Sequence, residues 1–294
     1  MRFTGASWNL AHDLRQMLAF PFMVHALRAG TIAAVLAGAL GWFMVLRRQS
    51  FAGHTLAVVS FPGAAGAILL GISGTAGYFA AAIAAALVIA AVPRQQGGLR
   101  GLNVGGSASA ESAVTGTVQA FALASGALFV SLYGGFLSGL TDLLFGSFLG
   151  ITAAQVTTLL AAAIAALAVL ALIARPLFFA SVDPDVAVAR GVRVRLLGTV
   201  FLLLLGCGAA EVSQITGALL VFALLVMPAA TAQLLTARPG VSFAATIALA
   251  VATAWLGLTT AFFSAYPIGF WVTTFGFGGY VLAALWRSAA TALA

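Results

Sequence analysis

Residues 152–174 read TAAQVTTLLAAAIAALAVLALIA, a run without a single charged side chain. A helix of this length can cross the hydrocarbon core of a bilayer, which is roughly 30 Å thick. The run is continuous in Ala and Leu instead of alternating, so it indicates a helix and not a barrel strand. Comparable runs recur along the chain, and we place the spans at 27–46, 54–72, 76–93, 112–133, 152–174, 196–210, 215–236, 241–264 and 266–286. The sequence therefore predicts an all-α, polytopic membrane bundle of about eight or nine transmembrane helices. The count is eight or nine because the sixth run is short and is either a tilted span or a re-entrant segment.

The composition supports a membrane location. Of 294 residues, 63% are hydrophobic and 6% are charged, whereas about one quarter of a soluble domain is charged. The net charge of +7 does not indicate nucleic-acid binding. The basic residues are arginines at the ends of apolar runs, and they form no basic face that could follow phosphates.

The arginines also predict the topology. With nine spans, ten of them fall in connections on one side of the membrane: Arg47, Arg48, Arg94, Arg100, Arg175, Arg190, Arg193, Arg195, Arg238 and Arg287. The positive-inside rule makes that side cytoplasmic, so we expect a cell-membrane protein with its C-terminus inside and its N-terminus outside. Arg2, Arg15 and Arg28 oppose this trend. Residues 1–20 lack the features of a signal peptide, and we interpret residues 1–25 as an extracytoplasmic interfacial segment.

The connection at 175–195 is the longest charged one on the predicted cytoplasmic side. Within it, Asp183 is a good N-cap, Pro184 suits a first helical position, and Gly191 suits the position after a helix end. These residues predict a helix of about two turns, which we interpret as a docking element in preference to a tether.

Pro62 and Pro228 lie inside predicted spans, where each breaks the helical hydrogen bonding. Such a break either lines a cavity or serves packing alone.

The sequence argues against an enzyme. The chain contains no lysine, and a Walker A phosphate loop needs one, so this chain is not expected to hydrolyse ATP. Only His54, Asp142 and Glu211 come near membrane depth as polar groups, which is too few for intramembrane catalysis. Transport is the remaining function.

Three stretches carry a resemblance to a known family. They are LRRQSFAGHTLAVVSFPG at 46–63, DPDVAVARGV at 183–192 and TGALLVFALLVMPAATA at 216–232, and the third is the most specific. They resemble the permease subunits of metal-ion ABC importers of the zinc, manganese and iron-chelate type. With lesser matches, the resemblance runs from about residue 45 to 286, nearly the whole chain.

The resemblance implies a single permease domain over residues 1–294 that works as a homodimer in the lipid bilayer. It implies a separate ABC ATPase that contacts the cytoplasmic coupling loop 175–195, and an extracytoplasmic solute-binding protein that delivers substrate. The coupling residues would be Asp183, Pro184, Asp185, Ala189 and Gly191. No cofactor is expected. The transported substrate would be a divalent transition-metal ion, zinc or manganese, with zinc first.

The chain departs from the family at the expected metal ligands. Members carry an acid followed four residues later by a His, whereas this chain has His54 and Val58, and Ser147 stands where many members have Asp. His54 is either a pathway ligand or a water-exposed residue at the end of its span. Asp142 is either a metal-capturing or a solvated loop acid. Glu211 is either a metal ligand or an acid that opens the next helix and complements its dipole.

Two rival functions remain open. One is an ABC permease for a metal chelate or another solute. The other is a standalone secondary transporter, which would need internal repeats and an ionisable pair at the midplane. The sequence shows neither feature.

Overall fold

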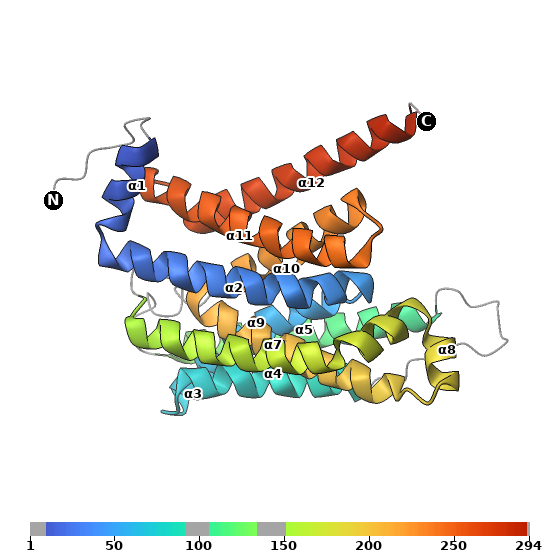
Figure 1. Ribbon diagram of the computed structural model, residues 1–294. Coiled ribbons are helices and arrows are strands. Elements are labelled where there is room, and N and C mark those ends of the chain that lie inside the picture. The colour runs from blue at the N-terminus through green and yellow to red at the C-terminus, as the bar shows by residue number, and fades with distance from the viewer. Residues whose placement is uncertain (1–9, 92–105, 134–150, 293–294) are drawn as a thin grey trace.

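The computed structural model describes residues 10–91, 106–133 and 151–292 (Figure 1). Asp142, Ser147, Arg94 and Arg100 lie outside these residues. All regular structure in the described ranges is helical, which confirms the predicted fold class. The helices are α1 (Leu10–Leu18), α2 (Pro21–Leu46), α3 (Ser50–Leu69), α4 (Gly74–Ala91), α5 (Gly106–Leu132), α7 (Ala153–Val182), α8 (Pro184–Ala189), α9 (Val194–Thr216), α10 (Ala218–Leu235), α11 (Pro239–Phe263) and α12 (Ile268–Ala292).

Nine of the described helices account for the nine predicted spans. Eight are long and apolar enough to cross a membrane, and α10 contributes a shorter apolar stretch, Leu220–Leu235. The prediction that the sixth span is short (196–210) is wrong, because α9 runs over 23 residues from Val194 to Thr216. The shorter helix is α10, which begins at Ala218, and Gly217 between α9 and α10 has φ of +79°.

Two further boundaries differ from those predicted. Helix α7 continues through Pro176 to Val182, so residues 175–182 are helical and the connection before α9 is compact. Helix α2 already begins at Pro21, so residues 21–25 belong to the first span. Helix α1 precedes it and lies across the end of the bundle, steeply inclined to α2 (Figure 1). Its Met17 side chain is buried.

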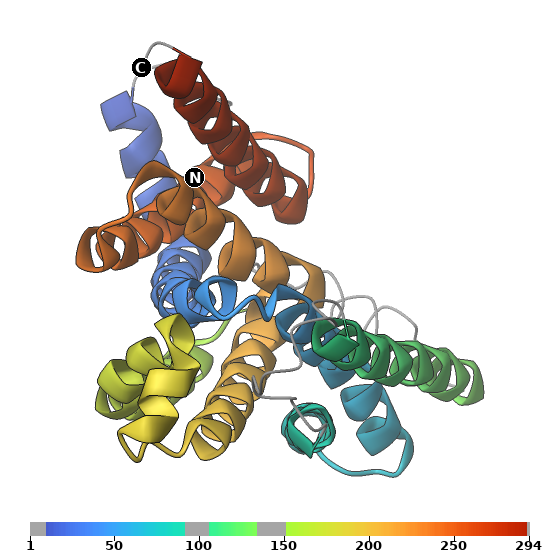
Figure 2. The same ribbon diagram turned by 90° about the vertical axis from the view of Figure 1, so that its right-hand side faces the viewer.

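Helix α2 lies in the middle of the bundle, between α10 and α11 on one side and α7 and α9 on the other (Figure 2). Small residues allow the helices to approach closely, as is usual where lipid supplies no hydrophobic driving force. A Cβ atom at Gly41 of α2 would overlap the carbonyl oxygen of Leu225 in α10. Gly63 of α3 and Gly77 of α4 are related in the same way, since a Cβ on either would overlap the carbonyl of the other.

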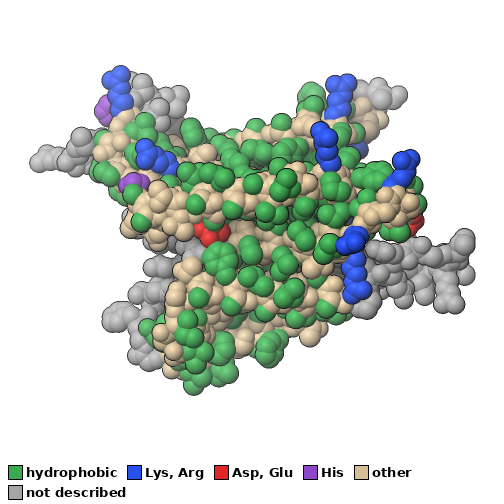
Figure 3. Space-filling view, turned by 60° about the horizontal axis from the view of Figure 1, so that its bottom comes forward, with side chains coloured by type: hydrophobic (Ala, Val, Ile, Leu, Met, Phe, Trp, Pro, Cys, Tyr) green, Lys and Arg blue, Asp and Glu red, His purple; other side chains and the backbone are tan. Residues whose placement is uncertain are grey.

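The two termini of the chain lie at opposite ends of the bundle (Figure 1). Arginine side chains gather at these two ends and are missing from the middle of the face that Figure 3 shows. One end, which we call the arginine-rich end, carries α8, the C-terminal ends of α2, α7, α10 and α12, and the N-terminal ends of α9 and α11. The described arginines predicted to lie on the cytoplasmic side are all at this end: Arg47, Arg48, Arg175, Arg190, Arg193, Arg195, Arg238 and Arg287.

Candidate coupling and translocation sites

The predicted short helix is present as α8, and the predicted residues form its ends. The carboxylate Oδ1 of Asp183 accepts a hydrogen bond of 3.0 Å from the backbone N–H of Val186, and Pro184 is the first helical residue. At the other end the N–H of Val192 donates to the carbonyl of Ala187 over 3.0 Å. Gly191 between them has φ of +79°, a conformation that L side chains rarely adopt.

One side chain of α8 is buried and the others are exposed. Ala187 is fully buried, whereas Val186 is 43% and Val188 50% exposed, and Ala189 is also exposed. Val182 before α8 and Leu196 after it are more than half exposed. We call these four exposed side chains on and beside α8, Val182, Val186, Val188 and Leu196, the coupling surface. Exposed apolar side chains close together on a surface are typical of protein-binding sites.

Arg47 connects the neighbourhood of α8 to the start of α3. Its Nη1 donates to Ser181 Oγ over 3.1 Å, and Ser181 lies in the last turn of α7. Its Nε donates to Gln49 Oε1 over 3.1 Å at the N-terminus of α3. The guanidinium also lies over the ring of Phe201 in α9, 5.6 Å from its centroid. The sequence drew attention to Arg47 through the family pattern, but it held no sign that this side chain joins three helices.

His54 lies about one turn from the start of α3, and its side chain is half-buried. Its ring packs against Phe222 of α10, with centroids 4.5 Å apart. A Cβ atom on the preceding residue, Gly53, would lie 3.6 Å from Cδ2 of Leu205, near the middle of α9. The Nδ1 atom of His54 is buried and has no hydrogen-bond partner in the described structure. A buried polar nitrogen without a partner is costly, so this position is suited to a passing ligand or water.

Val58 follows His54 by one helical turn and is buried. Its side chain offers no ligand, but its backbone does, because Pro62 four residues later has no N–H to donate to the Val58 carbonyl. Pro228 of α10 likewise leaves the carbonyl of Leu224 without its helical donor. Both prolines are buried inside helices, as predicted, and Pro62 packs against Gly126 of α5.

Glu211 is not at the start of a helix, so its predicted place in the first turn of the following span is wrong. It lies within α9, five residues before the helix ends at Thr216, and it is 8% exposed. A carboxyl group buried among membrane helices is expensive and usually functional. The described residues contain no group of three or more His, Cys, Asp or Glu able to hold a metal ion. Asp142 lies outside the described residues.

Known proteins resemble the chain over most of its length. Residues 19–287 match the ABC 3 transport family. The manganese transport system membrane protein MntC of Halalkalibacterium halodurans is 28% identical over 230 residues, which are 78% of this chain and 75% of MntC. The chelated iron transport system membrane protein YfeC of Yersinia pestis is 30% identical over 250 residues, 85% of this chain and 81% of YfeC.

A solved structure shares the fold. In PsaBC from Streptococcus pneumoniae in complex with Fab, one chain superposes with a TM-score of 0.79 at 22% sequence identity. The match covers 93% of this chain and 95% of the other. The resemblance inferred from three short stretches thus extends to the whole bundle, and the chain belongs to the ABC 3 transport family.

Proposed function

We propose that this chain is the permease subunit of an ATP-driven importer for manganese or a closely related divalent transition-metal ion. The observation that carries the substrate is the similarity, over about three quarters of the chain, to permeases named for manganese transport. Zinc, which the sequence put first, has no counterpart in the names of these relatives. Manganese therefore takes its place.

The proposed complex contains two copies of this chain in a cell membrane, a separate ABC ATPase and an extracytoplasmic solute-binding protein. The ATPase docks on the coupling surface at the arginine-rich end, which is cytoplasmic in this proposal because of the positive-inside rule. The binding protein delivers the ion to the opposite end. Since ATP is hydrolysed by the partner, this chain needs no catalytic residues.

The contacts of Arg47 support a route from the ATPase to the ion pathway. Closure of the ATPase would displace α8, which is continuous with α7 and α9 on either side. Arg47 binds α7 through Ser181 and lies over Phe201 of α9. It also binds Gln49 at the start of α3, one turn before His54. Movement of α8 would thereby reach the helix that carries the pathway imidazole.

The ligands proposed for the pathway are weak ones. The His54 imidazole and the freed carbonyl of Val58 lie on α3, and the Glu211 carboxylate lies further along the bundle on α9. Carbonyl and carboxylate oxygens suit manganese, which binds imidazole less strongly than zinc does. Weak binding is adequate here because conduction requires release.

A test of this function is substrate-stimulated ATP hydrolysis by the purified complex in proteoliposomes. Binding protein loaded with manganese should raise the hydrolysis rate above that with the metal-free binding protein. The Ala189→Glu variant of the permease should not respond. Equal rates with loaded and metal-free binding protein would contradict the proposal.

A second candidate is a chelated-iron importer. It is favoured by the 30% identity to YfeC over 85% of this chain. The same assay separates the two, because a binding protein loaded with chelated iron would then stimulate hydrolysis and one loaded with manganese would not.

A further inference from the structure

Trp42 of α2 is a buried residue that contacts three other helices near the arginine-rich end. Its indole Nε1 donates a hydrogen bond of 3.0 Å to Ser242 Oγ in the first turn of α11. Its backbone carbonyl accepts one of 2.9 Å from Nε2 of Gln233 in the last turn of α10. Its ring stacks on Phe178 of α7, with centroids 5.9 Å apart. One residue therefore joins α7 to both sides of the turn between α10 and α11.

The contact with α7 lies one helical turn from the coupling surface. Phe178 precedes Val182, a member of that surface, by four residues, so both lie on the same face of α7. Helix α7 ends at Val182 and α8 begins at Pro184, so a displacement of α8 is passed to the last turns of α7 (Figure 1). Because the interior is close-packed, a ring stacked on Phe178 moves with it.

The contact with α10 leads toward His54. Gln233 and Phe222 are about three helical turns apart on α10, so their side chains leave the helix in nearly the same direction. Phe222 packs against the His54 ring. Pro228 lies between Phe222 and Gln233, and helices bend most sharply where a proline interrupts their hydrogen bonds. Movement of the end of α10 would therefore change how the rest of α10 packs on His54.

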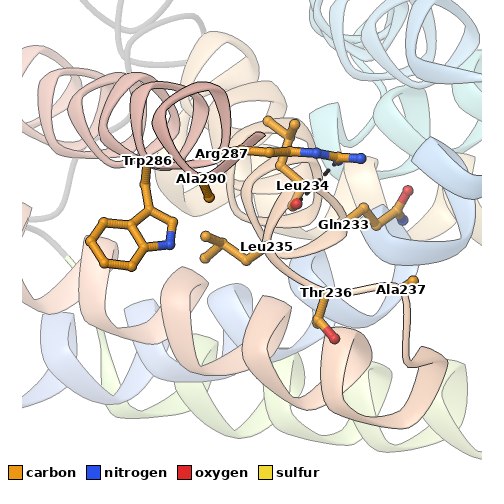
Figure 4. Close-up of a pocket in the computed structure, with 8 residues that line it drawn as sticks. All are labelled: Gln233, Leu234, Leu235, Thr236, Ala237, Trp286, Arg287 and Ala290. Carbon is orange, nitrogen blue, oxygen red and sulfur yellow. Dashed lines mark hydrogen bonds between the residues drawn. The ribbon is translucent and has the colours of Figure 1, made fainter. Parts of the chain in front are cut away.

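The end of α10 also has space beside it. A groove of about 290 Å³ lies between the ends of α10 and α12 (Figure 4). In the same view the Gln233 amide points away from Trp286 of α12, and it donates to the Trp42 carbonyl of α2. Close-packed helices do not shift past one another without strain, so this groove lets the end of α10 follow Trp42.

We propose that Trp42 is a positioning residue for transport, which transmits the displacement of α7 to the α10–α11 turn and so moves Phe222 relative to His54. This inference rests on the function proposed above. The route through Arg47 moves α3, which carries His54, whereas the route through Trp42 moves α10, which carries Phe222. The two routes act on the two sides of one ring contact, so the ion passes efficiently only when both routes are intact.

The number of ions carried per ATP hydrolysed tests this role. The permease is copurified with its ATPase and placed in proteoliposomes with binding protein loaded with manganese or with chelated iron, whichever cargo the wild type accumulates. Trp42→Phe keeps a ring but loses the N–H donor, and Gln233→Met loses its donor at a similar volume. Each should hydrolyse ATP at close to the wild-type rate, because the coupling surface is unchanged. Each should carry about five-fold fewer ions per ATP, the lower end of the usual coupling between two sites.

Trp255 supplies a matched control. It also joins α11 to α2 by an indole hydrogen bond, of 2.8 Å from its Nε1 to Thr31 Oγ1, but it is half exposed and contacts the other half of α2. Trp255→Phe should therefore keep the wild-type ratio of ions to ATP, which a general loss of helix contacts would not.

The outcomes separate this inference from the proposed function. A wild-type ratio in Trp42→Phe or in Gln233→Met, or an equal loss in Trp255→Phe, would overturn the role of Trp42 and leave the proposed function standing. If the wild type accumulates neither cargo, the proposed function fails, and the role of Trp42 fails with it.

Discussion

The His54 side chain makes a packing contact but leaves one polar atom unsatisfied. Its ring packs against Phe222, and its Nδ1 atom is buried without a hydrogen-bond partner in the described structure. His25 on α2 also has a buried, unpartnered Nδ1, so an isolated orphan nitrogen does not by itself mark the pathway. What distinguishes His54 is its place on α3, one turn from the carbonyl that Pro62 leaves free.

We expect His54→Ala to slow metal uptake by about ten-fold or more, a loss of the size seen when groups that support a metal ligand are removed. His54→Asp should restore most of the rate, because a carboxylate can replace the imidazole as a ligand. Initial rates of radioactive manganese uptake measure both effects. His25→Ala is the matched control and should transport normally. Wild-type rates in His54→Ala would remove this residue from the pathway.

Gly41 has a structural role that a substitution would expose. Its missing side chain lets α2 touch the backbone of α10 at Leu225. Gly41→Ala should force the two helices apart and destabilise the protein by about 1–3 kcal/mol, the usual cost of overpacking. Thermal unfolding of the detergent-purified chain would show a lower midpoint. Gly116→Ala, whose new methyl group would meet only Phe51 at 3.7 Å, should leave the midpoint nearly unchanged.

At the scale of the helices, hydropathy predicted the number and order of spans well, because lipid requires long apolar helices wherever the chain crosses. It failed where a polar residue or proline suggested an end. The sequence predicts that a span ends before Arg175 and Pro176, yet α7 continues to Val182. It predicts that Glu211 opens the next helix, yet this residue is buried in α9. A helix within a bundle tolerates both, since neighbouring helices cover a proline break or a buried acid.

The short helix α8 was predictable because its signals are local. Asp183, Pro184 and Gly191 act within one or two turns, and their geometry does not depend on distant parts of the chain. The contacts of Arg47 and the environment of His54 were not predictable in this way. They depend on which helices become neighbours, and a single sequence does not encode those distances in any local pattern.

Ala189 of α8 is exposed beside the coupling surface. We expect Ala189→Glu to place a charge in the proposed contact with the ATPase and to abolish ATP-driven uptake while the bundle stays folded. The measurement is uptake together with the amount of ATPase that copurifies. Gly240→Glu introduces the same charge at an exposed position of the arginine-rich end, where a side chain would meet nothing within 4 Å, and it should transport normally. Unimpaired uptake by Ala189→Glu would remove α8 from the coupling site.

At the scale of the whole molecule, the described arginines predicted to be cytoplasmic share one end of the bundle, and the two termini are at opposite ends. Cys207 is the only cysteine of the chain, so Cys207→Ala gives a background without cysteine. Single cysteines placed beside Arg48, Arg190, Arg238 and Arg287 in this background should all be labelled from the cytoplasmic side only. The physical reason is the positive-inside rule. A cysteine on α1, beside Arg15, is the control and should be labelled from outside. Labelling beside Arg190 from outside would show that the arginine-rich end is not cytoplasmic and would contradict the proposed topology.

The central claim is that this bundle passes a divalent transition-metal ion when a partner hydrolyses ATP. The most direct measurement is accumulation of radioactive manganese by vesicles that contain the complete complex, with and without ATP. The account predicts that wild type concentrates manganese only when ATP and the binding protein are both present, and that Ala189→Glu does not. If manganese does not accumulate under these conditions while the complex is intact and hydrolyses ATP, the account is contradicted.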